Sequence, residues 1–210
     1  MKHIKHIALS AVFTMAGCGT TGGQVSQDTS IQPDSQLYTT YNIWLMSKRQ
    51  SHNQKVINYK LPKAPILPAG TPVHNVSIVE PDIGSVELPY ITFTTDQNKT
   101  YEIKFTPKFH PGKSIKDHKK LMFSTASFGE LTDGMTEVEI KSIKQGVIRS
   151  GMSKKAVLTS YGYPPEHQTP ILRDSEWVYW TKRFRRKTIC FDENEMTTTC
   201  SGHVIPHDAL

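Results

Sequence analysis

Hydrophobic and polar residues alternate in the first half of the chain, and this pattern predicts β-structure between residues 37 and 112. In the clearest stretch, Tyr101, Ile103 and Phe105 alternate with polar residues. A period of two places such residues on one buried face, opposite a solvated one. Further strands are expected at 41–46, 71–79 and 90–94, with a hairpin loop at 96–99.

After residue 112 the pattern changes to short helices. Residues 114–123 form a candidate helix in which Ser114 and Asp117 have the spacing of a capping box. Thr136 and Glu139 repeat that spacing, with Gly146 as the expected end of the second helix. These caps predict two separate helices.

A third helix is expected to begin after Ser153 and to end at Gly162. Pro164 and Pro165 prevent its continuation. Helices of two turns are not stable alone in water, so we expect them to pack on a sheet. The aromatic segment Trp177–Trp180 is the candidate, within strands spanning 177–200.

Large rings occur on both faces of the aromatic strand. Trp177 and Tyr179 have one parity, and Val178, Trp180 and Phe184 have the other. One face is expected to pack on the helices. The other is expected to cover the N-terminal module or, as the alternative, to bind a partner protein.

Several C-terminal motifs together resemble the SmpA/OmlA family of BamE-like lipoprotein domains. They are Ile143-x-x-Gly146, Gly151-Met152-Ser153-Lys154-Lys155-x-Val157, Tyr161-Gly162-x-Pro164 and Trp177-x-Tyr179. The resemblance covers roughly the last 75 residues, and the whole chain is similar to bacterial lipoproteins that carry this domain behind a β-rich module. It implies an α-α-β-β(-β) domain that binds and stabilises a membrane β-barrel or its assembly machinery.

The N-terminus has the features of a bacterial lipoprotein signal. Lys2 and Lys5 precede a short apolar run, and Met15–Cys18 resembles a lipobox. In such signals the cysteine is acylated, so Cys18 is the expected lipidation site; the alternative is an ordinary export signal. Because Gly19 is not Asp, the expected location is the periplasmic face of the outer membrane. Acyl chains would anchor the protein firmly, at about 0.8 kcal/mol per buried CH₂.

The sequence therefore predicts an α+β protein with a lipid anchor. Residues 19–36 are rich in Gly, Ser, Thr and Gln and are expected to be a flexible tether. The short strands of 37–112 resemble a small SH3-like barrel, which would bind peptidoglycan or a peptide or would serve only as a packing module. The expected segments are a signal (1–18), a tether (19–36), a β module (37–112), a BamE-like domain (113–205) and a tail (206–210).

Two cysteines remain after Cys18. Cys190 and Cys200 form an even pair in an oxidising compartment, so a disulfide is expected. If they lay directly opposite each other, the loop between would contain an odd number of residues, for example 194–196. The alternative is a buried free Cys190 with Cys200 in a loose tail.

Charge and motifs favour binding over catalysis. The net charge of +6 is mildly basic, and the basic tip at Arg185 and Arg186 would touch anionic headgroups or remain solvated. No catalytic or phosphate-binding motif occurs, and Pro206 separates His203 from His207. We therefore expect no enzyme activity, cofactor, metal or nucleic-acid partner.

The expected function is that of a lipid-anchored binding or scaffold protein in envelope assembly or maintenance. Its partners would be outer-membrane proteins or their assembly machinery; the alternative is a peptidoglycan- or ligand-binding lipoprotein that uses the β module. The stiff loop after the third helix would present side chains at low entropic cost. The expected partner-binding residues are Tyr161, Tyr163, Pro164, Pro165, Glu166, His167, Arg185 and Arg186.

Overall fold

The computed structural model describes residues 25–26, 35–45, 53–55, 60, 64–182 and 184–200. The predicted signal with Cys18, most of the predicted tether and the predicted tail lie outside these residues.

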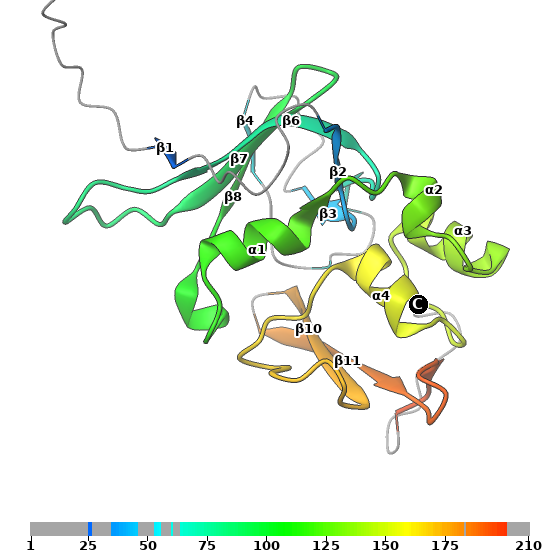
Figure 1. The fold of residues 1–210 in the computed structure, drawn as a ribbon. Helices are drawn as coiled ribbons and strands as arrows, with labels where there is room; N and C mark the ends of the chain where they lie inside the picture. The colour runs from blue at the N-terminus through cyan, green and yellow to red at the C-terminus, as the bar shows by residue number, and fades with distance from the viewer. Residues whose placement is uncertain are drawn as a thin grey trace, which may run out of the picture.

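The fold is α+β, as predicted, with three antiparallel or mixed sheets and few helices. Figure 1 shows α1 and α4 between the large N-terminal sheet and the β10–β11 hairpin. In chain order the elements are β1 (Val25–Ser26), β2 (Leu37–Thr39), β3 (Ile43–Trp44), β4 (Asn53–Lys55), β5 (Ile66–Leu67), β6 (Pro72–Val79), β7 (Tyr90–Thr95), β8 (Thr100–Lys104), the 3₁₀ helix η1 (Pro107–Phe109), α1 (Ile115–Met122), β9 (Phe123–Ser124), α2 (Phe128–Leu131), α3 (Glu137–Gln145), α4 (Lys154–Tyr161), β10 (Glu176–Lys182), β11 (Arg185–Phe191) and β12 (Thr197–Thr198).

The N-terminal half forms a seven-stranded sheet in the order β4-β8-β7-β6-β2-β9, with β1 paired to β6. Ile91 and Phe93 of β7 are fully buried and lie opposite Ile103 and Tyr101 of β8. The Phe93 and Tyr101 rings stack with centroids 5.2 Å apart. The predicted alternation along β8 is therefore confirmed, and its apolar face lines the first hydrophobic core.

Two residues of the predicted tether pair with this sheet. Val25 and Ser26 form β1, opposite Val79 and Ile78 of β6. On that edge of β6, β2 pairs only near the start of the strand, which leaves later backbone groups available to another strand. The expectation of free chain throughout 19–36 is wrong at these residues.

Helix α1 belongs to the N-terminal core. It begins after the predicted capping box of Ser114 and Asp117. Ile115 and Met122 are buried in the same cluster as the sheet residues, and Phe123 of β9 pairs with Thr39 of β2. The expected boundary at residue 113 therefore separates α1 from the core on which it packs. The boundary was misplaced because amphipathic spacing identifies the buried face of a helix but not the element that covers this face.

Helices α3 and α4 have the predicted ends and share one capping carboxylate. Gly146 ends α3 in the left-handed conformation, and Gly162 follows α4. One oxygen of Glu139 accepts hydrogen bonds from the backbone and hydroxyl of Thr136, and the other accepts two from Ser153. Burial alone would raise the pKa of Glu139, but these hydrogen bonds lower it below its usual value. One carboxylate thus fixes the starts of both helices.

The second hydrophobic core lies between these helices and the three-stranded sheet β10-β11-β12. Trp177 and Tyr179 are each 1% exposed and pack there with Ile143 and Val157. The prediction that one face of the aromatic strand covers the helices is confirmed.

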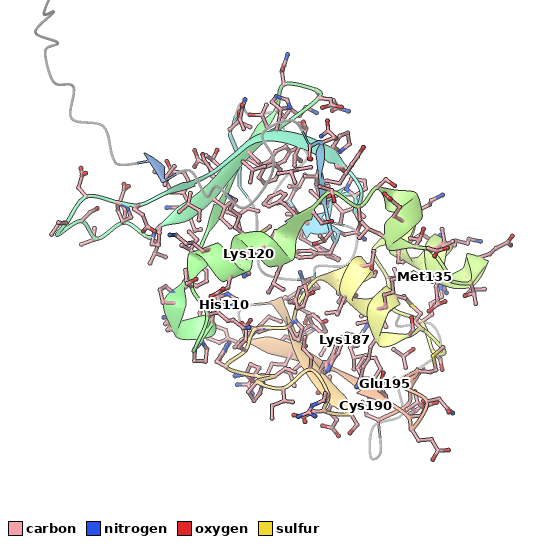
Figure 2. The ribbon with its side chains drawn as sticks, in the orientation of Figure 1. His110, Lys120, Met135, Lys187, Cys190 and Glu195 are labelled. Atoms are coloured by element: carbon pink, nitrogen blue, oxygen red, sulfur yellow. A yellow bond between two sulfur atoms is a disulfide. The ribbon has the colours of Figure 1, made fainter. Side chains whose placement is uncertain are left out.

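The cysteine pair closes the end of this sheet. The sulfurs of Cys190 and Cys200 are bonded at 2.05 Å, with Cα atoms 5.2 Å apart. Figure 2 shows Cys190 on the hairpin that turns near Glu195. Cys190 pairs with Thr198 rather than with Cys200, so the cysteines share a face but are offset by two residues. Asp192 accepts a hydrogen bond from the Met196 backbone, which places the turn one residue earlier than expected.

The two-stranded sheet of β3 and β5 lies between the two cores. Ile43 and Trp44 are neighbours in β3, and their side chains enter the first and second core respectively, because successive side chains of a strand point to opposite faces. Next to them, Asn42 is fully buried. Its amide donates to the carbonyls of Ile143 and Ser160, and its oxygen accepts from the Ala69 N–H. The two halves are therefore packed together as one body.

Candidate functional site

A cavity of about 440 Å³ lies where the two halves meet. Pockets of this size accept small organic molecules. Its walls come from the segment around β3, from β8, η1 and α1, from the loop after α4, and from β10. The lining residues are Tyr41, Asn42, Ile43, Trp44, Lys60, Ile103, Lys108, Phe109, His110, His118, Met122, Tyr163, Pro165, His167, Tyr179, Trp180 and Phe184.

An ion pair across the junction fixes one wall. Nδ1 of His110, which follows η1, lies 2.6 Å from a carboxylate oxygen of Glu166 in the loop after α4. The two side chains are 12% and 15% exposed. Burial alone would raise the pKa of Glu166, but the hydrogen bond and charge of His110 lower it. The ionised carboxylate only accepts, so Nδ1 of His110 is the donor. Figure 2 shows His110 at the end of the N-terminal half that faces the β10–β11 hairpin.

His118 of α1 is the second imidazole in this wall. Its ring lies 4.8 Å from the His110 ring and 5.6 Å from the Phe105 ring, centroid to centroid. Burial lowers the pKa of His118 to about 4, with a smaller contribution from the positive charge of His110. Its buried Nδ1 atom has no hydrogen-bond partner among the described residues. Such an unsatisfied atom costs about 1–3 kcal/mol.

Lys60 contributes an ammonium group. Its Nζ lies 4.5 Å from the centroid of the Trp44 ring, a cation–π contact. Its backbone N–H donates to the carbonyl of Trp180, which ties this residue to β10. Burial lowers the pKa of Lys60 to about 7. The site therefore contains a lysine whose charge changes near neutral pH.

Aromatic rings form most of the remaining wall. Tyr41 meets Tyr163 edge to face, with centroids 6.1 Å apart. The His167 ring is packed between Phe109 (5.1 Å) and Trp180 (6.2 Å, stacked). His167 also donates from Nδ1 to the Phe109 carbonyl at 3.0 Å. The walls are thus apolar and stiff, with polar groups at a few points, which is the usual composition of a ligand site.

Close packing holds the loop after α4 against the N-terminal half. Gly162 has φ +75°, and a Cβ atom there would lie 2.7 Å from the Tyr41 ring. Only glycine satisfies both requirements at this position. The Gly162 carbonyl also accepts from the hydroxyl of Tyr179 at 2.9 Å.

The structure places the predicted partner-binding loop at the junction rather than on an open surface. Tyr161 is 7% exposed and belongs to the second core, and Pro164 is also buried. Tyr163, Pro165 and His167 line the cavity, and Glu166 supports His110.

The other two predicted partner-binding residues lie outside this loop. Arg185 and Arg186 are exposed at the β10–β11 hairpin, where the guanidinium of Arg186 lies 5.3 Å from the centroid of the Trp180 ring. Phe184 beside them is 88% exposed. These exposed residues adjoin the cavity, because Phe184 and Trp180 both belong to its lining.

Sequence reasoning missed Lys60, His118 and Trp44 as members of one site. A signal existed for His118, since Ile115, His118 and Met122 have the spacing of one helix face. No comparable pattern marks Lys60, which reaches the cavity only through tertiary packing.

The comparisons with known proteins returned no match: no family model, no curated protein and no solved structure matches the chain. Within the described residues, no helix combines the length and apolar character needed to cross a membrane. No three potential metal ligands cluster in that part of the chain either. The site is therefore interpreted from its own geometry.

Proposed function

We propose that this chain is a lipid-anchored envelope protein that acts by binding, and that its binding site is the cavity between the halves. The supporting observation is that both halves contribute walls to one aromatic cavity of about 440 Å³. The proposal of a lipid anchor at Cys18 rests on the lipobox-like sequence Met15–Cys18. Attachment at the periplasmic face of the outer membrane would follow from that anchor.

Binding without catalysis is consistent with the arrangement of the polar groups. The Glu166 carboxylate is engaged by His110, and His167 donates to a backbone carbonyl. These contacts stiffen the walls. In this proposal the resemblance to BamE-like domains behind an SH3-like module describes the scaffold, and the junction between the two supplies the site.

Ligand retention tests this function. The full chain is purified from membranes, and small molecules extracted from it are compared by mass spectrometry with those from Trp180→Ala, which opens one wall. Ile83→Ala is the matched control, because Ile83 is fully exposed and outside the lining. The proposal predicts a species that copurifies with wild type and Ile83→Ala and is lost from Trp180→Ala. Equal recovery from all three proteins would refute it.

Anchoring is tested separately. Replacing Cys18 with Ser should move the protein from the membrane fraction to the soluble periplasm. Retention in the membrane would exclude an anchor at this residue.

A second candidate function is a scaffold for outer-membrane proteins or their assembly machinery. The observation that favours it is the exposed hairpin surface of Phe184, Arg185 and Arg186. In a cross-linked pull-down from outer membranes, Arg185→Glu/Arg186→Glu should lose partners. Lys113→Glu/Lys116→Glu serves as control, since both lysines are exposed elsewhere. An identical set of partners from every protein would exclude this surface.

A further inference from the structure

The lining of the cavity holds basic side chains and no acidic ones. Among the described residues, its lining contains Lys60, Lys108 and three imidazoles but no carboxylate. Glu166 is not part of the lining and forms an ion pair with His110. Within the described part of the chain, no acid lies within ion-pair distance of the Lys60 ammonium. Because charges in a partly buried site are only weakly screened by salt, the lining favours a negative group.

Two polar groups of this positive wall have no polar side-chain partner within the described residues. The Lys60 ammonium rests on the Trp44 ring, which holds it without neutralising its charge. Nδ1 of His118 is buried without a partner in the described structure. Burial and, to a smaller extent, the charges of His110 and Lys60 disfavour protonation of His118. A ligand oxygen beside Lys60 would accept a hydrogen bond from its ammonium, and one that reached His118 would accept from it in its Nδ1–H tautomer.

The rest of the wall is suited to a flat apolar body. Tyr41, Tyr163, Phe109 and Trp180 present ring faces or edges to the cavity. Ring–ring contacts favour planar groups over flexible chains, at about 0.5–1.5 kcal/mol beyond the area buried. The volume of about 440 Å³ leaves room for a molecule of two or three fused or linked rings.

We infer that the cavity binds a small aromatic anion, with its carboxylate, sulfonate or phosphate beside Lys60 and His118 and its ring between the aromatic walls. This inference rests on the proposed binding function and specifies its ligand class. Occupation would satisfy the imidazole nitrogen and would keep Lys60 protonated. Binding is therefore coupled to proton uptake by Lys60.

The coupling predicts a pH dependence. The titratable groups that share the cavity with Lys60 are Lys108, His110, His118, His167, Tyr41, Tyr163 and Tyr179, with Glu166 behind His110. Burial lowers the pKa of Lys60 to about 7, so the free site loses this charge as the pH rises from 6 to 8.5. Affinity for an anion falls over this range, whereas affinity for a neutral ring compound does not.

A pair of probes separates charge from shape. The probes are 1-anilinonaphthalene-8-sulfonate and N-phenyl-1-naphthylamine, which have the same rings with and without an anionic group. Their fluorescence is titrated with the full chain carrying Cys18→Ser, so that neither acyl chains nor detergent compete for them. We expect the sulfonate to bind at one site about tenfold more tightly than the neutral probe at pH 6.

Variants locate the anion site. Lys60→Met should weaken sulfonate binding about tenfold at pH 6, reduce its pH dependence and leave the neutral probe unchanged. His118→Phe, which keeps a ring at this position, should weaken only the sulfonate. Lys120→Met on the exposed side of α1 is the control, and Ile83→Ser/Val86→Ser removes exposed apolar groups that attract such probes nonspecifically. Neither control should change affinity.

The outcomes distinguish this inference from the proposed function. If both probes bind equally and Lys60→Met has no effect, the anion preference is wrong while the cavity remains a binding site. Loss of sulfonate binding in Ile83→Ser/Val86→Ser, with none in Lys60→Met, would place the probe outside the cavity and overturn the inference. Failure of wild type to bind either probe would overturn it too, whereas the proposed function is decided by the copurified ligand.

Discussion

Asn42 offers a direct test of how the two halves are joined. We consider Asn42→Leu, which keeps the number of side-chain heavy atoms and the branch at Cγ and removes all side-chain hydrogen bonding. The amide of Asn42 bonds the carbonyl of Ile143 at 2.7 Å, the carbonyl of Ser160 at 3.1 Å and the N–H of Ala69 at 2.9 Å. The substitution removes the three bonds at once.

The expected magnitude follows from the groups left behind. Three buried backbone groups lose their side-chain partner, but the carbonyl of Ile143 keeps its hydrogen bond from the Gly146 N–H. Two groups are therefore left unsatisfied, at about 1–3 kcal/mol each. Some relaxation is expected, so the free energy of unfolding should fall by about 2–4 kcal/mol. Native domains are stable by only about 5–15 kcal/mol, so a change of this size is easily measured. Asn42→Asp should be at least as destabilising, because an oxygen then faces the carbonyls of Ile143 and Ser160.

The assay is urea unfolding followed by tryptophan fluorescence and far-UV circular dichroism. Trp44, Trp177 and Trp180 are the three tryptophans of the chain, so the fluorescence reports on the junction and second core. Asn194→Leu is the control, since Asn194 is exposed in the β11–β12 turn; it should change stability by less than about 0.5 kcal/mol. If Asn42→Leu costs under about 1 kcal/mol, the idea that this amide holds the halves together is wrong.

Three further predictions concern stability. The pKa of Lys60 is lowered to about 7, so the unfolded chain binds more protons between pH 7 and 10 and wild-type stability rises with pH there. Lys60→Met should be about 2 kcal/mol more stable at pH 6 and should lack this rise in Tm. An unchanged slope of Tm against pH in the variant would contradict the lowered pKa of Lys60. Cys190→Ser/Cys200→Ser should lower the free energy of unfolding by about 2–3 kcal/mol, and reductant should bring wild type to the same denaturation midpoint without affecting the variant; a reductant-insensitive wild type would argue against the bond. Glu139→Gln should lower the free energy of unfolding by about 2 kcal/mol at pH 7. Because the folded pKa of Glu139 is lowered, this contribution is present above pH 4.5 and is lost as the pH falls through the folded pKa. Equal stability differences between wild type and variant at pH 7 and pH 3 would exclude the ionised Glu139 as the shared cap.

Local patterns were sufficient to locate most elements in the described part of the chain. Capping boxes at Ser114 and Thr136, the cap at Ser153 and the terminating Gly146 were readable because capping depends on residues three or four positions apart. Period-two alternation identified β8 for the same reason. The α+β class and the helix-helix-strand order followed from these local signals.

Pairings between distant residues were not readable in this way. β9 is a two-residue strand, and its partner β2 lies more than eighty residues earlier. Nothing local distinguishes such a segment from a loop. The same limitation explains why the expected boundary at residue 113 separated α1 from the core on which it packs, and why the two-residue offset between Cys190 and Cys200 was not predicted.

The sequence by itself determined where helices begin and end, which strand faces are apolar, and that residues 163–167 form a stiff loop. Only the tertiary structure decided that this loop faces inward and that His110, His118 and Lys60 line one cavity with it. The physical reason is that caps and periodicity are set by neighbours along the chain. A cavity, in contrast, is formed by side chains that meet only after both halves have packed around Asn42 and Trp44.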